Sequence, residues 1–222
     1  MLIIPNFVDT DMYRAGSSMV VPDKELFPDT TVLKLMYAGN IGHAQDWEPL
    51  IRVAHKLKEA PVAFWIIGEG VLKDQLKKQI EDNGLNNLFL LPYQPRERMP
   101  GIVNYADIHF IFMNPQLDGQ GLPSKVYSIM ACKKPLLITS GLDTPLYNFL
   151  KDKDCAFLIS EAEIERKCDQ IVAVLNSLIE NRSVMKDFGE HAFKIIQKKY
   201  AKDTVIKQYM QLSKNLLDSR TT

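Results

Sequence analysis

Six short apolar segments, separated by stretches with helical patterns, constrain the fold of this chain more than any other feature. Each segment is hydrophobic on both faces of an extended strand, which is typical of parallel sheets that helices cover on both sides. The intervening stretches are long enough to hold the crossover helices that parallel strands require. The sequence therefore predicts an α/β fold with a Rossmann-like, doubly wound parallel sheet of about six strands. The segments are 32–39, 62–68, 87–92, 108–113, 135–139 and 155–160.

Hydrophobic residues at helical spacing place helices between and after these segments. The first helix is expected to begin near Asp46, and the second to end before Gly84, because glycine commonly follows the end of a helix. Three further helical patterns, 164–180, 183–199 and 203–217, follow the last strand. A sheet already covered by crossover helices has no room for all three. We therefore expect the last helix to pack at an edge or on another domain.

Composition excludes several classes of protein. Hydrophobic residues make up 46% of the chain, charged residues 24%, and the formal net charge is zero, so nothing indicates a nucleic-acid-binding surface. The three cysteines are odd in number and widely spaced, which favours reduced thiols over disulfides or a metal site. No apolar run approaches the roughly 18 residues of a spanning helix, and no signal-peptide core opens the sequence. We expect a cytoplasmic protein.

The segment 118–137 has the features of an anion-binding loop. Its glycines precede Pro123, Ser124 and Lys125, where a helix is expected to begin with Pro123 in its first turn. Free N–H groups, the positive end of the helix dipole, a hydroxyl and a lysine together are suited to hold a phosphate. This predicts a nucleotide or nucleotide-sugar ligand. Taken alone, an ordinary loop with a solvated lysine is the alternative.

Glycines also follow the first two predicted strands, at the rim where open α/β sheets bind ligands. The loops Gly39-Asn40-Ile41-Gly42 and Gly68-Glu69-Gly70 lack the spacing of a dinucleotide fingerprint. Either loop alone is equally consistent with a tight turn, but their occurrence together with Lys125 favours ligand contact. His43 follows the first of these loops, and two interpretations of it remain: it contacts the phosphates of the ligand, or it is an ordinary loop histidine.

Five motifs, in order along the chain, resemble the C-terminal, donor-binding half of family-4 retaining glycosyltransferases, which have the two-domain GT-B architecture. The resemblance implies that the whole chain is a nucleotide-sugar donor-binding domain, inactive without an N-terminal half that binds the acceptor. The abrupt apolar, strand-like start of the sequence likewise indicates a fragment of a longer protein. The motifs are IPNFVDT at 4–10, YAGNIG at 37–42, IIGEG at 66–70, YADI at 105–108 and PSKVYSIMACKKPLL at 123–137.

The resemblance also implies a division of the chain and a set of site residues. Residues 1–30 are expected to link the two halves, 31–181 to form the Rossmann-like core, and 182–222 to form C-terminal helices. Lys125 is expected to meet the donor phosphates. The predicted catalytic residues are Lys125 and Gln120, and the predicted donor-binding residues are Gly39, Asn40, Ile41, Gly42, Gly68, Glu69, Gly70, Tyr93, Gln94, Asp118, Gly119, Gly121, Leu122, Pro123, Ser124 and Ser128.

Two departures from the family pattern affect what is expected of the donor. Gln120 and Ser128 stand where the family usually has the two carboxylates of a Glu-x7-Glu motif. Asn40 and Gln45 stand where many members carry an arginine and a lysine. The combination resembles the branch that makes capsule, O-antigen and colanic-acid-type polysaccharides, which implies a UDP-sugar donor and a glycan or lipid-linked acceptor.

No cofactor, metal or nucleic-acid partner is expected. The sequence Asp152-Lys153-Asp154 imitates a metal-binding D-x-D motif, but its position after a helix favours a solvated turn. Any contact with the inner face of a membrane is expected to come from the other half of the protein. A noncatalytic nucleotide-sugar-binding module and a sugar-nucleotide epimerase of the same architecture are the alternatives, and a Rossmann dehydrogenase is the weakest.

Overall fold

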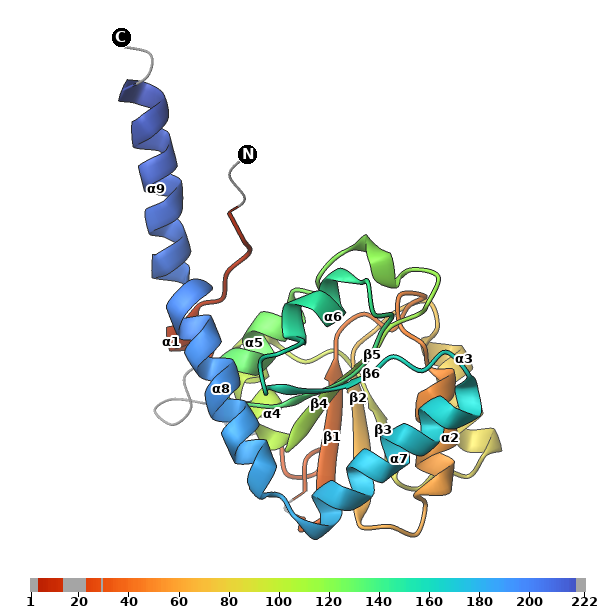
Figure 1. Ribbon diagram of the computed structural model, residues 1–222. Helices are drawn as coiled ribbons and strands as arrows, with labels where there is room; N and C mark the ends of the chain where they lie inside the picture. The colour runs from red at the N-terminus through yellow and green to blue at the C-terminus, as the bar shows by residue number, and fades with distance from the viewer. Residues whose placement is uncertain (1–3, 14–22, 29, 219–222) are drawn as a thin grey trace.

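The computed structural model describes residues 4–13, 23–28 and 30–218, and within them it has the predicted doubly wound α/β fold (Figure 1). All six apolar segments form strands of one parallel sheet in the order β3-β2-β1-β4-β5-β6. The order reverses between the neighbours β1 and β4, and such a reversal opens a crevice at the carboxyl ends of the strands. The strands are β1 Leu33–Ala38, β2 Val62–Ile67, β3 Leu88–Leu91, β4 Ile108–Phe112, β5 Leu136–Thr139 and β6 Ala156–Ile159.

Helices cover both faces of the sheet, as the apolar strands require. Successive residues of β1 show why: Tyr37 packs in the same core cluster as α2, α3 and α7, whereas Met36 packs with α4. On that second face α5 and α8 cover β4 and β5. The helices are α1 Thr10–Tyr13, α2 Glu48–Lys56, α3 Lys73–Asp82, α4 Met99–Tyr105, α5 Lys125–Ala131, α6 Pro145–Leu150, α7 Ile164–Glu180, α8 Ser183–Lys199 and α9 Lys202–Asp218, with 3-10 turns η1 Arg96–Arg98 and η2 Asp118–Gln120.

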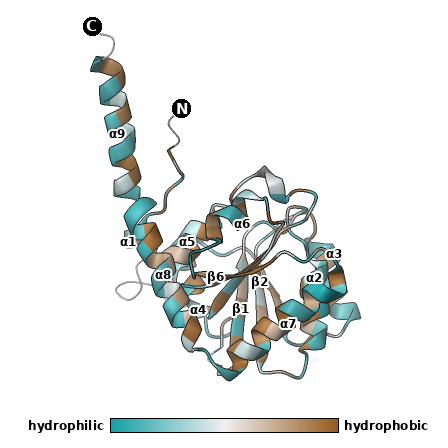
Figure 2. Ribbon diagram, in the orientation of Figure 1, coloured by the Kyte–Doolittle hydropathy of each residue, from teal (hydrophilic) through white to brown (hydrophobic). Residues whose placement is uncertain are grey.

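The core fills the space between the sheet and its two layers of helices. Phe64 and Trp65 of β2 point to opposite faces and are both almost fully buried. Each such side chain contributes about 1.5–3 kcal/mol through burial. Figure 2 shows hydrophobic residues gathered on the strands and hydrophilic residues spread over the outer helix surfaces.

Two helix starts differ from the sequence-based prediction. The helix expected near Asp46 begins at Glu48, with Pro49 in its first turn, where a missing N–H leaves no bond unmade. The helix after the anion-binding segment begins at Lys125, so Pro123 lies before its first turn and not within it. The Pro123 carbonyl instead accepts a hydrogen bond from the Val126 N–H at 3.1 Å.

The three C-terminal helices match their predicted ranges within one residue. Figure 1 shows α9 running on from α8 and away from the sheet, and among its described residues Val205 alone is buried. Residues 1–3 of the expected strand-like start lie outside the described part. Residues 4–7, which follow them, form no strand. Only Val8 pairs with a neighbour, in an isolated parallel bridge to Ala201. Among the described helices, none combines the length and hydrophobicity needed to cross a membrane.

Candidate functional site

A cleft of about 880 Å³ opens at the carboxyl end of β1, where the strand order reverses. Its walls come from the loop after β1, the start of α5, the segment around α1, and the loop after β3. A site at this position agrees with where open α/β sheets bind ligands. The cleft brings together seven of the predicted site residues, namely Gly39, Asn40, Tyr93, Pro123, Ser124, Lys125 and Ser128.

Lys125 is the principal cation of this cleft. Its Nζ lies 3.5 Å from the centroid of the Tyr37 ring, a geometry in which the ring face attracts the ammonium. The surrounding protein removes water from the ammonium and lowers the pKa of Lys125 to about 7. An arriving anion would favour the charged form and reverse this shift. Lys125 is therefore placed to gain a proton when a phosphate binds.

Tyr37 contacts both the loop after β1 and the ammonium of Lys125. Its hydroxyl donates a hydrogen bond to the carbonyl oxygen of Asn40 at 2.7 Å, and its ring meets Trp47 edge-on at 5.1 Å. Burial raises the pKa of Tyr37, so the hydroxyl keeps its proton and stays a donor. One side chain thus orients the loop after β1 and supports the ammonium of Lys125.

Gly39 leaves the space that Lys125 occupies. Its φ is +152°, and a Cβ added there would lie 2.4 Å from the Nζ of Lys125. A side chain at this position would displace the ammonium and strain the backbone. This glycine has a direct role in shaping the cleft, and its predicted donor contact stays a prediction.

The glycines of the second loop have a different role from the one expected. A Cβ on Gly68 would lie 1.9 Å from the carbonyl oxygen of Gly39, and one on Gly70 would lie 2.2 Å from that of Ile41. The Gly39 N–H donates to the Ile67 carbonyl at 2.9 Å, which holds the two loops side by side. Neither Gly68 nor Gly70 lines the cleft. Their missing side chains allow the loops to pack together.

The side chains of other residues in the two loops also contact the protein and not the cleft. Ile41 is fully buried in the core, and a Cβ on Gly42 would meet the Asn40 carboxamide at 2.7 Å. The Glu69 carboxylate accepts from Lys73 at 2.5 Å, and this bond lowers the pKa of Glu69. None of the three lines the cleft through its side chain, so their predicted donor contacts would have to come from the backbone.

Tyr93 and Gln94, the two predicted donor-binding residues after β3, differ in their exposure and surroundings. Tyr93 lines the cleft with 67% of its surface exposed, which leaves a ring face available to a ligand. Gln94 is buried, and its Nε2 donates to the Pro92 carbonyl at 3.1 Å. Tyr93 fits the expected contact, whereas the side chain of Gln94 supports its own loop.

The loop before α5 faces two different hollows. Asp118 accepts a hydrogen bond from the Gly141 N–H at 2.9 Å and lines a separate pocket of about 220 Å³. Gly119 and Gly121 are exposed, with no atom within 4 Å of an added Cβ, and Leu122 packs partly buried beside α5. The backbone of Gln120 lies in η2, and its side chain is outside the described part. The Asp118 carboxylate thus holds the loop after β5 and does not line the cleft, so its predicted donor contact stays a prediction.

Ser128 lies one helical turn after Lys125 and keeps its place in the cleft. Its hydroxyl donates to the Lys125 carbonyl at 2.9 Å, which leaves its oxygen lone pairs free to accept from a ligand. The sequence analysis missed Arg96, which adds a second positive charge, and the ion pair of Lys202 with Asp9 at 3.1 Å. These three come from segments whose approach to the cleft depends on tertiary packing, and no motif spacing indicated it.

Histidines and cysteines play structural parts in the described residues. His109 is fully buried, hydrogen-bonded to the Val103 carbonyl at 2.9 Å, and burial lowers its pKa to about 4. His43 is exposed and lies outside the cleft walls. The three cysteines, Cys132, Cys155 and Cys168, are free and buried, as expected of reduced thiols.

The D-x-D-like sequence forms a turn. Asp152 and Asp154 both have positive φ, at 61° and 45°, and both are exposed, as predicted for a solvated turn. Among the described residues, no group of three or more histidine, cysteine, aspartate or glutamate side chains is arranged to hold a metal ion.

Comparison with known proteins assigns the chain to a family. The family described as Glycosyl transferases group 1 matches residues 23–195. The chain belongs to this family. Among its curated relatives is poly(ribitol-phosphate) alpha-N-acetylglucosaminyltransferase of Staphylococcus aureus, 28% identical over 183 residues, covering 78% of this chain and 34% of the relative. WcaI of Escherichia coli, named for colanic acid biosynthesis, is 29% identical over 138 residues, covering 62% and 32%.

Solved structures share the fold. The HepE protein of Anabaena in complex with UDP matches with a TM-score of 0.74 at 16% identity, over 97% of this chain and 57% of that one. The C-terminal domain of LpcC from Francisella tularensis matches with a TM-score of 0.67 at 16% identity, over 88% of this chain and 99% of that domain. This group 1 glycosyl transferase chain spans about a third of the length of the curated relatives it matches. It has the fold of a C-terminal domain, as expected.

The pKa of Lys125 predicts how the binding of a phosphate-containing ligand in this cleft should depend on pH. Below about pH 7 the free domain already carries the ammonium, and above it the proton must be gained on binding. Between pH 6.5 and 8.5 the Kd for UDP-glucose should therefore rise by roughly tenfold or more. UDP-glucose suits the test because its phosphates are diesters, without the terminal group that titrates near pH 6. Calorimetry across this range should find a flat profile for Lys125→Met; a flat wild-type profile would contradict the assignment.

Proposed function

We propose that this chain is the donor-binding half of a retaining glycosyltransferase, which binds a UDP-sugar for transfer to a glycan or lipid-linked acceptor in polysaccharide biosynthesis. The observation that carries the proposal is the cleft beside β1, where Lys125 lies above Tyr37 and against Gly39. Membership in group 1 of the glycosyl transferases supports it. A structural neighbour supports the choice of nucleotide, because HepE was solved with UDP and with UDP-glucose.

The cleft offers what a departing nucleotide diphosphate requires. Transfer of the sugar leaves negative charge on the diphosphate, and a lysine held in a low-dielectric cleft stabilises this charge as it develops. Arg96, which follows β3, adds a second cation to the cleft wall. The backbone of Gly39 lies against Lys125, because Gly39 has no side chain to intervene. We assign Lys125 to the phosphates, Tyr93 to the base and Ser128 to the ribose.

The remaining parts of the proposal concern the whole protein. We infer that residues 1–30 link this domain to an acceptor-binding half, that 31–181 form the donor-binding core and that 182–222 form the C-terminal helices. Gln120 is proposed to meet the donor sugar through its carboxamide. The three free, buried thiols favour a cytoplasmic location, where cysteines stay reduced.

Calorimetric titration of the domain with UDP, GDP and ADP tests the donor assignment. We expect UDP to bind at least about tenfold more tightly than the other two, equivalent to about 1.4 kcal/mol. Equal affinity for all three, or no heat with any of them at millimolar concentration, would contradict the proposal. With the full-length protein, sugar transfer to an acceptor separates a transferase from a noncatalytic module, and donor conversion without acceptor would identify an epimerase.

A further inference from the structure

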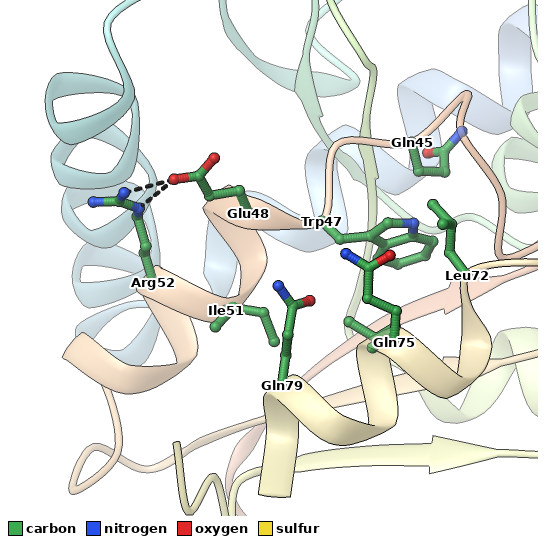
Figure 3. A pocket seen from close by; sticks show the side chains of 9 residues that line it. Gln45, Trp47, Glu48, Ile51, Arg52, Leu72, Gln75 and Gln79 are labelled. Atoms are coloured by element: carbon green, nitrogen blue, oxygen red, sulfur yellow. Dashed lines mark hydrogen bonds and ion pairs between the residues drawn. The ribbon is translucent and has the colours of Figure 1, made fainter. Parts of the chain in front are cut away.

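A second pocket lies between α2 and α3, and none of the predicted site residues lines it. It has a volume of about 450 Å³, within the range of roughly 300–1,000 Å³ typical of small-molecule sites. Figure 3 shows the side chains around it, with Glu48 and Arg52 on one side and Gln75 and Gln79 on the other. We propose that this pocket, called here the α2–α3 pocket, binds a neutral sugar or short oligosaccharide.

The charges around the pocket favour an uncharged ligand. Glu48 and Arg52 are the charged residues among those that line it, and they pair with each other at 2.5 Å. Arg52 is also bonded to Glu165 of α7, so its guanidinium is fully engaged by carboxylates. A phosphate or other anion would meet these carboxylates without a free cation to offset them. The pocket thus differs from the donor cleft, where Lys125 supplies the positive charge.

Three carboxamides supply hydrogen-bonding groups in this neutral setting. Those of Gln75 and Gln79 make no hydrogen bond within the part of the chain that the structure describes, and they flank the opening in Figure 3. A carboxamide both donates and accepts, as a sugar hydroxyl does, so the two groups can pair in either direction. Such polar side chains around an apolar floor are typical of specific ligand sites.

Gln45 gives the strongest indication that a ligand is needed. It is 9% exposed, its Oε1 has no hydrogen-bond partner among the described residues, and its Nε2 reaches only the Sδ of Met113 at 4.0 Å. A buried carbonyl oxygen without a donor destabilises the free protein, because it has lost its hydrogen bonds to water. In Figure 3 the Gln45 side chain lies beyond Trp47, at one end of the pocket. The last torsion of a glutamine is broad, so a small rotation would bring the oxygen to a ligand hydroxyl.

The floor of the pocket matches the apolar face of a sugar ring. Ile51 and Leu76 are buried beneath it, with Leu72 and the indole of Trp47 beside them. The indole N–H already donates to the Gly42 carbonyl at 3.3 Å, and Trp47 is 8% exposed, so it adds only a small apolar surface to the pocket wall. Gln45 also lines the donor cleft, which places the α2–α3 pocket next to the proposed site of transfer.

The two tryptophans of the chain provide a direct test. In protein labelled with 5-fluorotryptophan, Trp47 reports on the α2–α3 pocket, while Trp65 packs against Phe89 on the other face of the sheet and serves as the internal control. Cellobiose and N,N′-diacetylchitobiose are the probes. We expect at least one of them to shift the Trp47 fluorine resonance saturably, with a Kd of about 1–10 mM, and to leave Trp65 unmoved.

Matched variants distinguish this site from the donor cleft. Gln75→Ala combined with Gln79→Ala should weaken the sugar-dependent shift at least tenfold, whereas Lys77→Ala combined with Lys78→Ala, on the exposed side of the same helix, should not. Lys125→Ala should leave sugar binding intact, so failure of the proposed donor function would not affect this result. No saturable shift with either disaccharide up to about 50 mM, an unchanged shift in the glutamine double variant, or an equal shift with UDP would overturn the proposal.

Discussion

A Gly68→Ala variant should unfold roughly 6–12 °C below the unsubstituted domain, equivalent to a loss of about 3 kcal/mol or more in the free energy of unfolding. The added Cβ would lie 1.9 Å from the carbonyl oxygen of Gly39, which is backbone and cannot rotate away. The positive φ of +152° adds strain for any residue with a side chain. The two loops after β1 and β2 must then separate, with loss of the Gly39 N–H bond to Ile67. Thermal and urea unfolding followed by circular dichroism measure the effect.

Gly119→Ala is the matched control for this substitution. Gly119 lies in the loop before α5, is exposed, and has no atom within 4 Å of the position of an added Cβ. The same chemical change should therefore leave the unfolding midpoint within about 1–2 °C of the original, since surface substitutions commonly change stability by less than about 0.5 kcal/mol. Equal unfolding midpoints for the two variants would show that Gly68 is not required for the loops after β1 and β2 to pack together.

Lys125→Met should weaken UDP-sugar binding about 10- to 100-fold while leaving the domain as stable as before or slightly more so. The lost charge-assisted hydrogen bond to phosphate accounts for roughly 1.5–3 kcal/mol of affinity. Stability should not fall, because the ammonium is partly desolvated in the free domain, as its lowered pKa shows, and methionine keeps the contact with the Tyr37 ring. Calorimetry with UDP-glucose gives the affinity, and thermal unfolding without ligand gives the stability.

Lys133→Ala is the control for the loss of a lysine. Lys133 follows the other end of α5 and pairs with Glu190 at 2.8 Å on the surface. It has no place in the cleft, so its removal should change the affinity for UDP-glucose less than twofold. A loss of less than about threefold in Lys125→Met, or a similar loss in both variants, would remove Lys125 from the phosphate site.

The sheet could be predicted from the sequence because its signal is local. Strands buried on both faces are apolar at nearly every position. A run such as 62–68 can therefore be recognised as a strand without knowing which strands lie beside it. Lys125 and Gly39 could also be anticipated, since each follows directly from a residue type placed at a strand or helix end. The family resemblance joined these separate signals into one site.

The rest of the site depends on contacts between distant segments. Gly68 and Gly70 look like ligand-approach glycines until the loop after β1 is placed beside them. Asp118 carries a side chain suited to a sugar, yet the Gly141 N–H from the loop after β5 is its partner. Arg96 and the orphaned oxygen of Gln45 have no sequence signal, because each is defined by what lies around it in three dimensions.

The bridge between Val8 and Ala201 has a thermodynamic consequence for the cleft. The neighbouring pair of Asp9 and Lys202 joins segments 193 residues apart in the sequence, and both residues stand in the cleft wall. Any ligand that touches this wall binds best when the two segments are docked. By reciprocity, docking of the segments must then improve ligand affinity by the same factor by which the ligand favours docking. The affinity of the cleft is accordingly a property of the junction between the first and last described segments as much as of the loops around Lys125.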